Sequence, residues 1–256
     1  AKTIHLMSEA MSYAYADRSK FLGDPDFVDV PQSWLTSPDY AAQVRDRIDP
    51  AHATPATRIR PGTPPAGESN ETTHFSIVDA DGNAVSNTYT LNFSYGVGLI
   101  ADGTGILLNN ELDDFSAKKG VPNAYGLIGG AANAVEPNKR PLSSMTPTIV
   151  FRNGKGVLVT GSPGGSRIIT TVLQVILNTV THGLDIASAT AAPRIHDQWL
   201  PDEIRIEQGI SPDTVRILEE MGHKVAVKDA MGSTQSIQVG ADGTLYGASD
   251  PRRACS

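Results

Sequence analysis

The chain of 256 residues has little of several features that mark a protein class. Its one cysteine, Cys255, cannot form an internal disulfide and lacks partners for a structural zinc site. A formal net charge of −7 and a pI near 5.3 argue against nucleic acid or an anionic membrane surface as a partner. The longest apolar run, from Ile168 to Val180, is interrupted by threonine and glutamine and predicts a buried helix, not a membrane span.

Metal ligands and a targeting segment are also not evident. The six histidines are scattered, and no two have a spacing that suggests metal binding. We therefore expect no metal and no other cofactor. The first residues, Ala1 to Met11, include no initiator methionine and no signal peptide, so we expect a fragment or a trimmed product of a longer chain.

Hydrophobic periodicity, turn residues and helix caps predict the regular elements. Helices are expected over residues 3–20, 38–48, 166–183, 185–192 and 211–222. A hairpin is expected over 74–91, and strands over 146–152, 156–160, 223–228, 234–239 and 244–246. Most of 21–71 and 93–145 should be irregular. Strands followed by helices and further strands indicate a mixed α and β layered fold.

The junction between Glu71 and Thr72 is the most informative part of the chain. The segment from Arg60 to Asn70 contains three prolines and two glycines, so it cannot pack as a helix or a central strand. A threonine that begins a strand and is exposed by proteolysis can act as a nucleophile, with its own α-amine as the base. On Thr72 and Thr73 alone, ordinary β-branched strand residues are the better interpretation.

Other polar segments supply further chemistry. Gly164-Gly165, before a predicted helix, can direct two N–H groups at a ligand oxygen as an oxyanion hole, or can form a tight turn. Residues 109–115 concentrate carboxylates that can bind an ammonium or a metal, or can form a solvated loop. Ser143 and Ser144 are hydroxyl donors or a cap. Together with Thr72, these are the parts of a metal-free acyl-transfer enzyme for an amino-acid-like substrate.

Several long motifs resemble those of the γ-glutamyltransferases, members of the N-terminal nucleophile hydrolase superfamily. They are Glu68-Ser-Asn-Glu-Thr-Thr-His-Phe-Ser76 and the segments 107–116, 138–145, 161–166, 232–236 and 246–252. The resemblance covers essentially the whole chain. It implies an α+β fold, a four-layer αββα sandwich that is incomplete here because most of the large subunit is absent. Residues 1–71 would end the large subunit, and 72–256 would form the small catalytic subunit.

The resemblance also implies an activity. The precursor would cleave itself between Glu71 and Thr72, and Thr72 would attack the γ-carbonyl of glutathione or another γ-glutamyl compound. Water, or the amine of an amino acid or peptide, would then accept the γ-glutamyl group. Thr90 would support the nucleophile, and Gly164 and Gly165 would form the oxyanion hole.

Substrate-binding residues follow from the same resemblance. The groups that hold the α-amino end correspond to Asn92, Glu111 and Asp114, with Glu111 standing where other members carry glutamine. The α-carboxylate would be bound by Ser143 and Ser144. Residues 115–135, with Tyr125, resemble the lid loop over the glutamyl pocket.

The resemblance also implies a partner and a location, and it leaves two alternative functions open. The missing large-subunit region would cover apolar sheet surface and supply an arginine for the α-carboxylate. The family implies a periplasmic or secreted location. A cephalosporin (glutaryl) acylase on the same scaffold is the alternative enzyme, but its substrate has no α-ammonium, so Asp114 favours the transferase. An inactive, unprocessed fragment is the other alternative.

Overall fold

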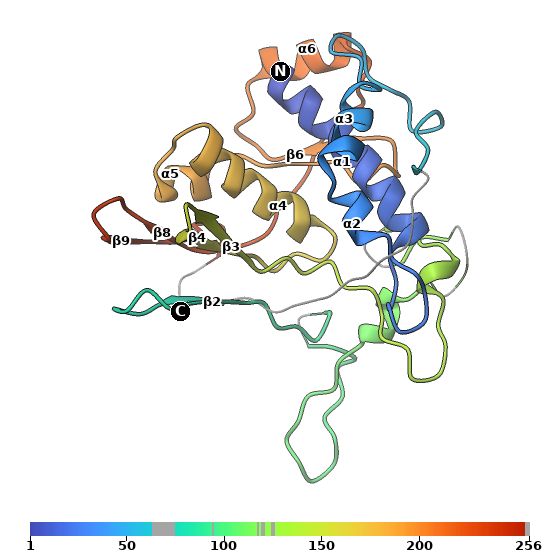
Figure 1. The fold of residues 1–256 in the computed structure, drawn as a ribbon. Helices are drawn as coiled ribbons and strands as arrows, with labels where there is room; N and C mark the ends of the chain where they lie inside the picture. Colours follow the sequence, from blue (N-terminus) through green and yellow to red (C-terminus); the bar gives the residue numbers. More distant parts are fainter. Residues whose placement is uncertain (63–74, 94, 117, 119–120, 124–125, 254–256) are drawn as a thin grey trace. The chain divides into compact units, whose positions relative to one another are not determined.

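A computed structural model describes residues 1–256 except 63–74, 94, 117, 119–120, 124–125 and 254–256 (Figure 1). The chain forms two compact units. Unit 1 comprises residues 1–70, 91–143 and 195–227, and unit 2 comprises 71–90, 144–194 and 228–256. The bond between residues 71 and 72 lies outside the described residues, so the division into 1–71 and 72–256 stays a prediction.

Unit 1 contains most of the helices. They are α1 (Lys2–Phe21), α2 (Gln32–Leu35), α3 (Pro38–Arg45) and α6 (Pro212–Glu220), with 3-10 turns at Glu111–Asp114 and Ala131–Asn133. The hydroxyl of Ser37 caps α3 by accepting a hydrogen bond from the Tyr40 N–H at 3.1 Å. Proline occupies the first turn of both α3 and α6, where its missing N–H is not needed. The predicted helices over 3–20, 38–48 and 211–222 are therefore confirmed, although α3 ends at Arg45.

A small mixed sheet forms the rest of unit 1. Strand β5 (Ile195–His196) pairs antiparallel with β6 (Ile204–Ile206), which pairs parallel with β7 (Val225–Val227). The parallel pair is joined by a crossover that contains α6, as parallel strands require. Met11 of α1 packs with Ile195, Ile204 and Ile206 in the core. Sequence reasoning predicted β7 but missed β5 and β6.

Unit 2 is built on an antiparallel sheet. Its strand order is β3 (Thr148–Arg152), β4 (Lys155–Thr160), β8 (Gln235–Val239) and β9 (Leu245–Ser249). Asn153 and Gly154 both have positive φ, 52° and 75°, which the predicted Asn-Gly hairpin turn requires. All four strands were predicted, and all are confirmed.

Two helices cover one face of this sheet and a hairpin covers the other (Figure 1). Helix α4 (Arg167–Ile176) continues as a π-helix over Leu177–Thr181, and α5 (Ile186–Ala191) is capped by Asp185. The predicted hairpin is β1 (Phe75–Val78) with β2 (Ala84–Asn87). Hydroxyls at both of its strands donate to the sheet, from Ser76 to the Gln235 carbonyl at 2.9 Å and from Ser86 to the Thr160 carbonyl at 3.1 Å.

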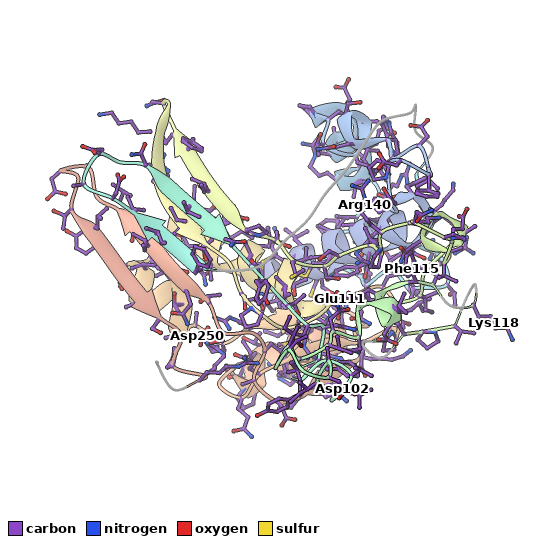
Figure 2. All side chains as sticks on the ribbon, turned by 90° about the horizontal axis from the view of Figure 1, so that it is seen from below. Asp102, Glu111, Phe115, Lys118, Arg140 and Asp250 are labelled. Atoms are coloured by element: carbon purple, nitrogen blue, oxygen red, sulfur yellow. The ribbon has the colours of Figure 1, made fainter. Side chains whose placement is uncertain are left out.

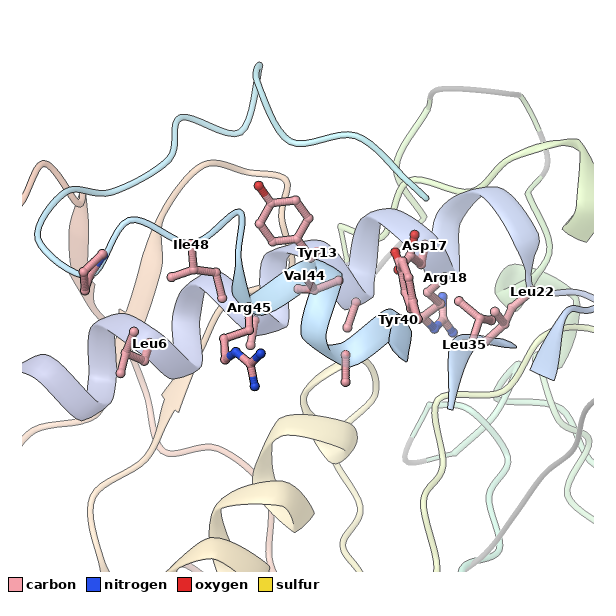
Figure 3. Close-up of a pocket in the computed structure, with 14 residues that line it drawn as sticks. Leu6, Tyr13, Asp17, Arg18, Leu22, Leu35, Tyr40, Val44, Arg45 and Ile48 are labelled. Carbon is pink, nitrogen blue, oxygen red and sulfur yellow. The ribbon is translucent and has the colours of Figure 1, made fainter. Parts of the chain in front are cut away.

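A cavity of about 730 Å³ lies in unit 1, between α1 and α3 (Figure 3). Its lining is mostly apolar, with Leu6, Tyr13, Leu22, Val44 and Ile48 among the contributors. Tyr40 donates to Asp17 at its edge, with 2.6 Å between the oxygens. None of the predicted site residues that the structure describes lines this cavity. No helix in the described part of the chain combines the length and the apolar character that a membrane span requires.

Candidate active site

The predicted site residues fall into both units. Unit 1 contains the residues expected to bind most of the substrate's amino-acid end, Asn92, Glu111, Asp114 and Ser143. Unit 2 contains Thr90, Ser144, Gly164 and Gly165. The predicted nucleophile Thr72, its neighbour Glu71 and the lid residue Tyr125 lie outside the described residues.

The acidic segment of unit 1 forms an ordered turn. Asn109 Oδ1 accepts a hydrogen bond from the Glu111 N–H at 2.9 Å, and the turn then runs from Glu111 to Asp114. The Asn92 amide donates to the carbonyl of Asn110 at 3.1 Å, which fixes Asn92 next to Glu111. Phe115 anchors the far end because its side chain is 3% exposed (Figure 2). The structure thus favours a built acidic turn over a solvated loop.

Asn133 joins the acidic turn to the serine segment. Its side-chain amide donates to the carbonyl of Asp114 at 2.7 Å. Its side-chain oxygen accepts from the N–H of Leu142 at 2.9 Å, one residue before Ser143. Asn133 is only 6% exposed, so the Asn133 side of both hydrogen bonds is shielded from water. One buried amide therefore sets the spacing between the residue expected to bind an ammonium and the residue expected to bind a carboxylate.

Arg18 of α1 reaches the same two segments. Its guanidinium donates to the Ser143 carbonyl at 3.4 Å, and it shares the lining of a cavity of about 180 Å³ with Asp114. Burial lowers the pKa of Arg18, and the charge of Asp114 opposes this shift. Asp114 is therefore held beside a cation from the part of the chain expected to belong to the large subunit.

Arg140 anchors the segment that leads to the serines. Its backbone N–H and its guanidinium both donate to Asp24, with distances of 2.5 to 3.0 Å, and a further contact reaches Asp26 at 2.5 Å. The hydrogen bonds from Arg140 hold the pKa of the buried Asp24 carboxyl well below its usual range. Arg140 lies inside a motif quoted above, and the structure explains its presence there as an anchor.

The glycine pair of unit 2 forms the turn between β4 and α4. Gly164 and Gly165 have φ of 142° and 58°, conformations that side chains other than glycine rarely adopt. Carbonyls of both glycines accept from the first turn of the helix, at Arg167 and Ile168. No described residue accepts a hydrogen bond from the N–H of either glycine. Two N–H donors thus remain available at a helix start, as an oxyanion hole requires.

A second loop holds this turn in place. The hydroxyl of Ser162 accepts from the N–H of Ser233 at 2.9 Å, and the N–H of Gln235 donates to the Gly161 carbonyl at 3.2 Å. Gly232 has φ of 71°, and a Cβ at this position would lie 2.6 Å from the Ser162 hydroxyl. The loop around residue 232 can therefore approach the glycine turn only without a side chain.

A buried ion-pair network holds that second loop. Arg194, 2% exposed, donates to Asp250 and to the Met231 carbonyl, each at 2.5 Å. Asp250 also accepts from the Thr234 N–H at 2.8 Å and from Arg252 at 3.1 Å. Burial raises the pKa of Asp250, but the hydrogen bonds from these donors and the charge of Arg194 together lower it by more. The pKa of Asp250 therefore lies below its usual value. The last two motifs of the chain thus support the glycine turn.

Comparison with solved structures defines the fold class. A cephalosporin acylase from Bacillus halodurans matches with a TM-score of 0.82 and 28% identity, covering 98% of this chain and 43% of that one. A T380A mutant of the γ-glutamyltranspeptidase from Helicobacter pylori matches with a TM-score of 0.69 and 57% identity, covering 71% of this chain and 100% of that one. The α+β fold is that of the N-terminal nucleophile hydrolases.

The family follows from the sequence. The family model described as gamma-glutamyltranspeptidase matches residues 1–256, and the chain belongs to this family. The "Glutathione hydrolase proenzyme" of Escherichia coli (strain K12) is 64% identical over 252 residues, which are 98% of this chain and 43% of that protein. The chain therefore spans less than half the length of the curated relatives it matches.

Sequence reasoning missed two of the residues that position the site. Arg18 was treated only as part of an amphipathic helix, and Asn133 lay in a segment predicted to be irregular. A buried asparagine gives no periodic signal in a sequence. Its importance depends on Asp114 and Leu142, which lie on either side of it along the chain.

Proposed function

We propose that the full-length protein hydrolyses glutathione and other γ-glutamyl compounds and transfers their γ-glutamyl group to amino-acid or peptide amines. The observation that carries this proposal is the Asn133 link between the acidic turn and the serine segment. A γ-glutamyl compound presents an α-ammonium and an α-carboxylate at a fixed separation. Carboxylates and hydroxyl donors at a fixed separation are complementary to it.

The proposed reaction begins with cleavage of the bond between Glu71 and Thr72. The freed α-amine of Thr72 takes the proton from its hydroxyl, and the oxygen attacks the γ-carbonyl. The N–H groups of Gly164 and Gly165 stabilise the oxyanion that develops, and collapse expels the amine as the acyl-enzyme forms. Water or an acceptor amine then attacks the acyl-enzyme and restores the threonine hydroxyl.

Thr90 is the residue that the family resemblance assigns to the support of the nucleophile. It follows β2 of the hairpin, whose register with β1 runs from the Phe75–Asn87 pair to the Val78–Ala84 pair.

The proposal includes a partner and a location. The proposed partner is the remainder of the large subunit. The greater length of the curated relatives supports this proposal. The remainder would contribute the arginine that the substrate carboxylate needs. A periplasmic or secreted location is proposed from the family alone, and fractionation of the native host with an assay of γ-glutamyl anilide hydrolysis tests it. Activity confined to the cytoplasmic fraction would contradict this location.

Substitution of the nucleophile tests the function. In the full-length protein, Thr72→Ala should leave the chain uncut at residue 71 and abolish hydrolysis of a γ-glutamyl anilide. Mass spectrometry follows the cut, and absorbance follows the anilide. The neighbouring Thr73→Ala is the matched control and should retain both. Cleavage at the same bond in Thr72→Ala would show that another residue or a protease makes the cut. A wild-type protein that stays uncut and inactive would show that the protein is a non-enzymatic remnant.

The acylase alternative is favoured by one observation, the TM-score of 0.82 with the cephalosporin acylase. The two substrates differ in the α-ammonium, which a glutaryl group lacks. We expect the protein to hydrolyse γ-glutamyl anilide faster than glutaryl anilide, and Asp114→Ala to reduce this preference. Faster hydrolysis of the glutaryl compound by the wild-type protein would overturn the assignment.

A further inference from the structure

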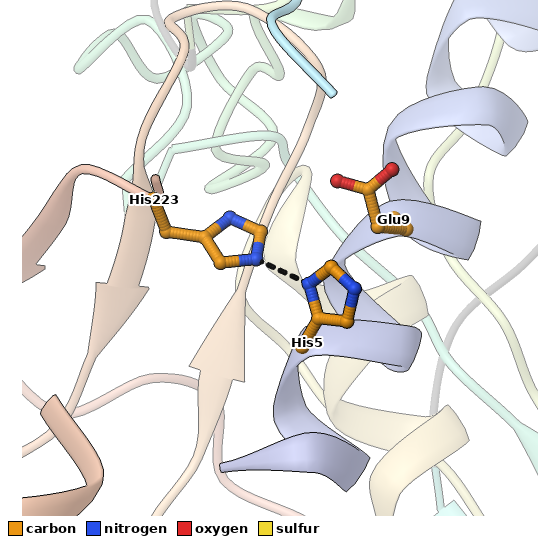
Figure 4. Close-up of side chains that lie close together, drawn as sticks. All are labelled: His5, Glu9 and His223. Carbon is orange, nitrogen blue, oxygen red and sulfur yellow. Dashed lines mark hydrogen bonds between the residues drawn. The ribbon is translucent and has the colours of Figure 1, made fainter. Parts of the chain in front are cut away.

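A buried histidine, a half-buried histidine and a buried glutamate meet in unit 1, and none of the three is a predicted site residue. His5 and Glu9 lie one turn apart on α1, which places them on the same helix face. His223 follows α6, where Gly222 has φ of 100° and turns the chain. One ligand atom from each of the three lies within 4.8 Å of the others (Figure 4).

The hydrogen bonds of His5 direct one nitrogen into this cluster. Its Nε2 lies 2.7 Å from the carbonyl of Asp49, which can only accept, so Nε2 carries the proton. Its Nδ1 is therefore the unprotonated nitrogen, and it accepts a hydrogen bond from Nε2 of His223 at 2.7 Å. Histidines that bind metals almost always donate their second N–H to a carbonyl or carboxylate in this way. His5 is fully buried, so its orientation is fixed by packing.

Glu9 brings a negative charge that its surroundings only partly satisfy. Its Oε1 accepts from the Thr54 N–H at 2.9 Å. Its Oε2 is buried and has no hydrogen-bond partner among the described residues, while the residue as a whole is 3% exposed. A buried carboxylate oxygen without a partner is costly, and a nearby cation offsets that cost.

We infer that His5, Glu9 and His223 form a zinc site. Two imidazole nitrogens and one carboxylate oxygen are a ligand set that Zn²⁺ takes in proteins, with a water molecule in the fourth position. His223 is only half-buried, so the ion has a route from solvent. The ion would join α1 to the end of α6. None of the predicted site residues is among its ligands, so the ion would take no part in the proposed acyl transfer.

Binding requires a small, definite change at the histidine pair. Two nitrogen ligands of a tetrahedral zinc ion lie about 3.3 Å apart. The histidine nitrogens here are 2.7 Å apart, so the ion would replace the proton that they share and separate the rings by about 0.6 Å. That proton moves to Nδ1 of His223, on the more exposed side of the cluster.

Metal titration of the full-length protein tests the site. After dialysis against a chelator, the protein should bind Zn²⁺ tightly with one equivalent per chain, measured by calorimetry and by metal analysis. His223→Gln should weaken this binding by about 100-fold or more, because it removes a ligand. This variant should also abolish the rise in Tm that Zn²⁺ produces. These readouts do not depend on catalysis, so they are independent of the proposed function.

Two further variants make the result specific. Glu9→Gln keeps the acceptor for the Thr54 N–H and the side-chain volume but removes the charge, and it should also weaken binding. His182→Gln changes an exposed histidine of unit 2 and should bind as the wild-type protein does. If Glu9→Gln does not fold, the zinc affinity of His223→Gln tests the site, because His223 is only half-buried. Absence of zinc binding by the wild-type protein, or equal binding by His223→Gln, would overturn the inference.

Discussion

Asn133 shows how a single residue can set the geometry of the proposed binding site through backbone contacts alone. It contributes a donor to one segment and an acceptor to another, and both partners are backbone groups. Backbone partners fix the positions of whole segments, so the side chains of Asp114 and Ser143 take their places from it. The residues expected to contact the substrate thus depend on a neighbour that was not predicted.

Substitution of Asn133 should therefore weaken substrate binding more than turnover. Asn133→Ala removes both hydrogen bonds, each with a net contribution of about 0.5–1.5 kcal/mol, so KM for a γ-glutamyl anilide should rise by about tenfold. We expect a smaller change in kcat because the glycine turn is untouched. Asn178→Ala, which removes one long hydrogen bond of 3.4 Å, is the matched control. A KM equal to that of the wild-type protein would show that the two segments hold their positions without Asn133.

At the scale of elements, the glycine turn before α4 depends on the loop around residue 232. Two strand-to-loop connections meet there, and Ser162 is the point of contact. The absence of a side chain at Gly232 permits this contact. Rigid placement of N–H donors is what an oxyanion hole needs, because misplaced donors lose most of their effect on the transition state.

Gly232→Ala should lower kcat more than it raises KM. The new methyl group would press on the Ser162 hydroxyl and on Thr171, where a Cβ would lie 2.6 and 2.9 Å from side-chain atoms. We expect the turn to shift and kcat to fall by about tenfold to a hundredfold. Gly154→Ala is the control because it shares a positive φ, 75°, but a Cβ there meets nothing within 4 Å. Equal kcat in the two variants would show that the turn does not depend on this contact.

The elements that sequence reasoning found are those with local signals. The Asn153-Gly154 turn and the Asp185 cap lie next to the residues they organise, so their effects could be predicted. Strands β5 and β6 have two and three residues, and they exist because they pair with each other, because β6 also pairs with β7, and because they pack on Met11. The cluster of His5, Glu9 and His223 was missed for the same reason. Contacts between distant parts of the chain have no local pattern.

At the scale of the whole molecule, the acidity of Asp197 makes stability depend on pH. Burial raises the pKa of this carboxyl from its ordinary value of 3.8 to about 6, and hydrogen bonds from Ser8 and Ser12 only partly oppose the shift. Between these two pH values the folded state therefore holds a proton that the unfolded state has lost. The contribution of Asp197 to the free energy of unfolding thus falls as the pH rises from about 4 to 6.

Asp197→Asn should remove this part of the pH dependence. The wild-type protein should lose up to about 3 kcal/mol relative to the variant between pH 4 and 7. Urea unfolding of the uncut Thr72→Ala protein, with and without the second substitution, measures the difference. Asp102→Asn, at an exposed position in unit 1, is the control. A difference between wild-type and Asp197→Asn stabilities that stays constant over this pH range would contradict the raised pKa.

The core around Met11 has a consequence for the proposed cleavage of the chain. Met11 precedes the predicted scissile bond, whereas its neighbours Ile195, Ile204 and Ile206 follow it. After cleavage, neither product could bury its share of this core alone, so the two would remain associated as complementary fragments. Refolding would then be a second-order reaction, with a yield that depends on protein concentration, while the uncut precursor would refold at a rate independent of it. Cleavage would thereby turn one folding unit into an obligate heterodimer without moving an atom of its core.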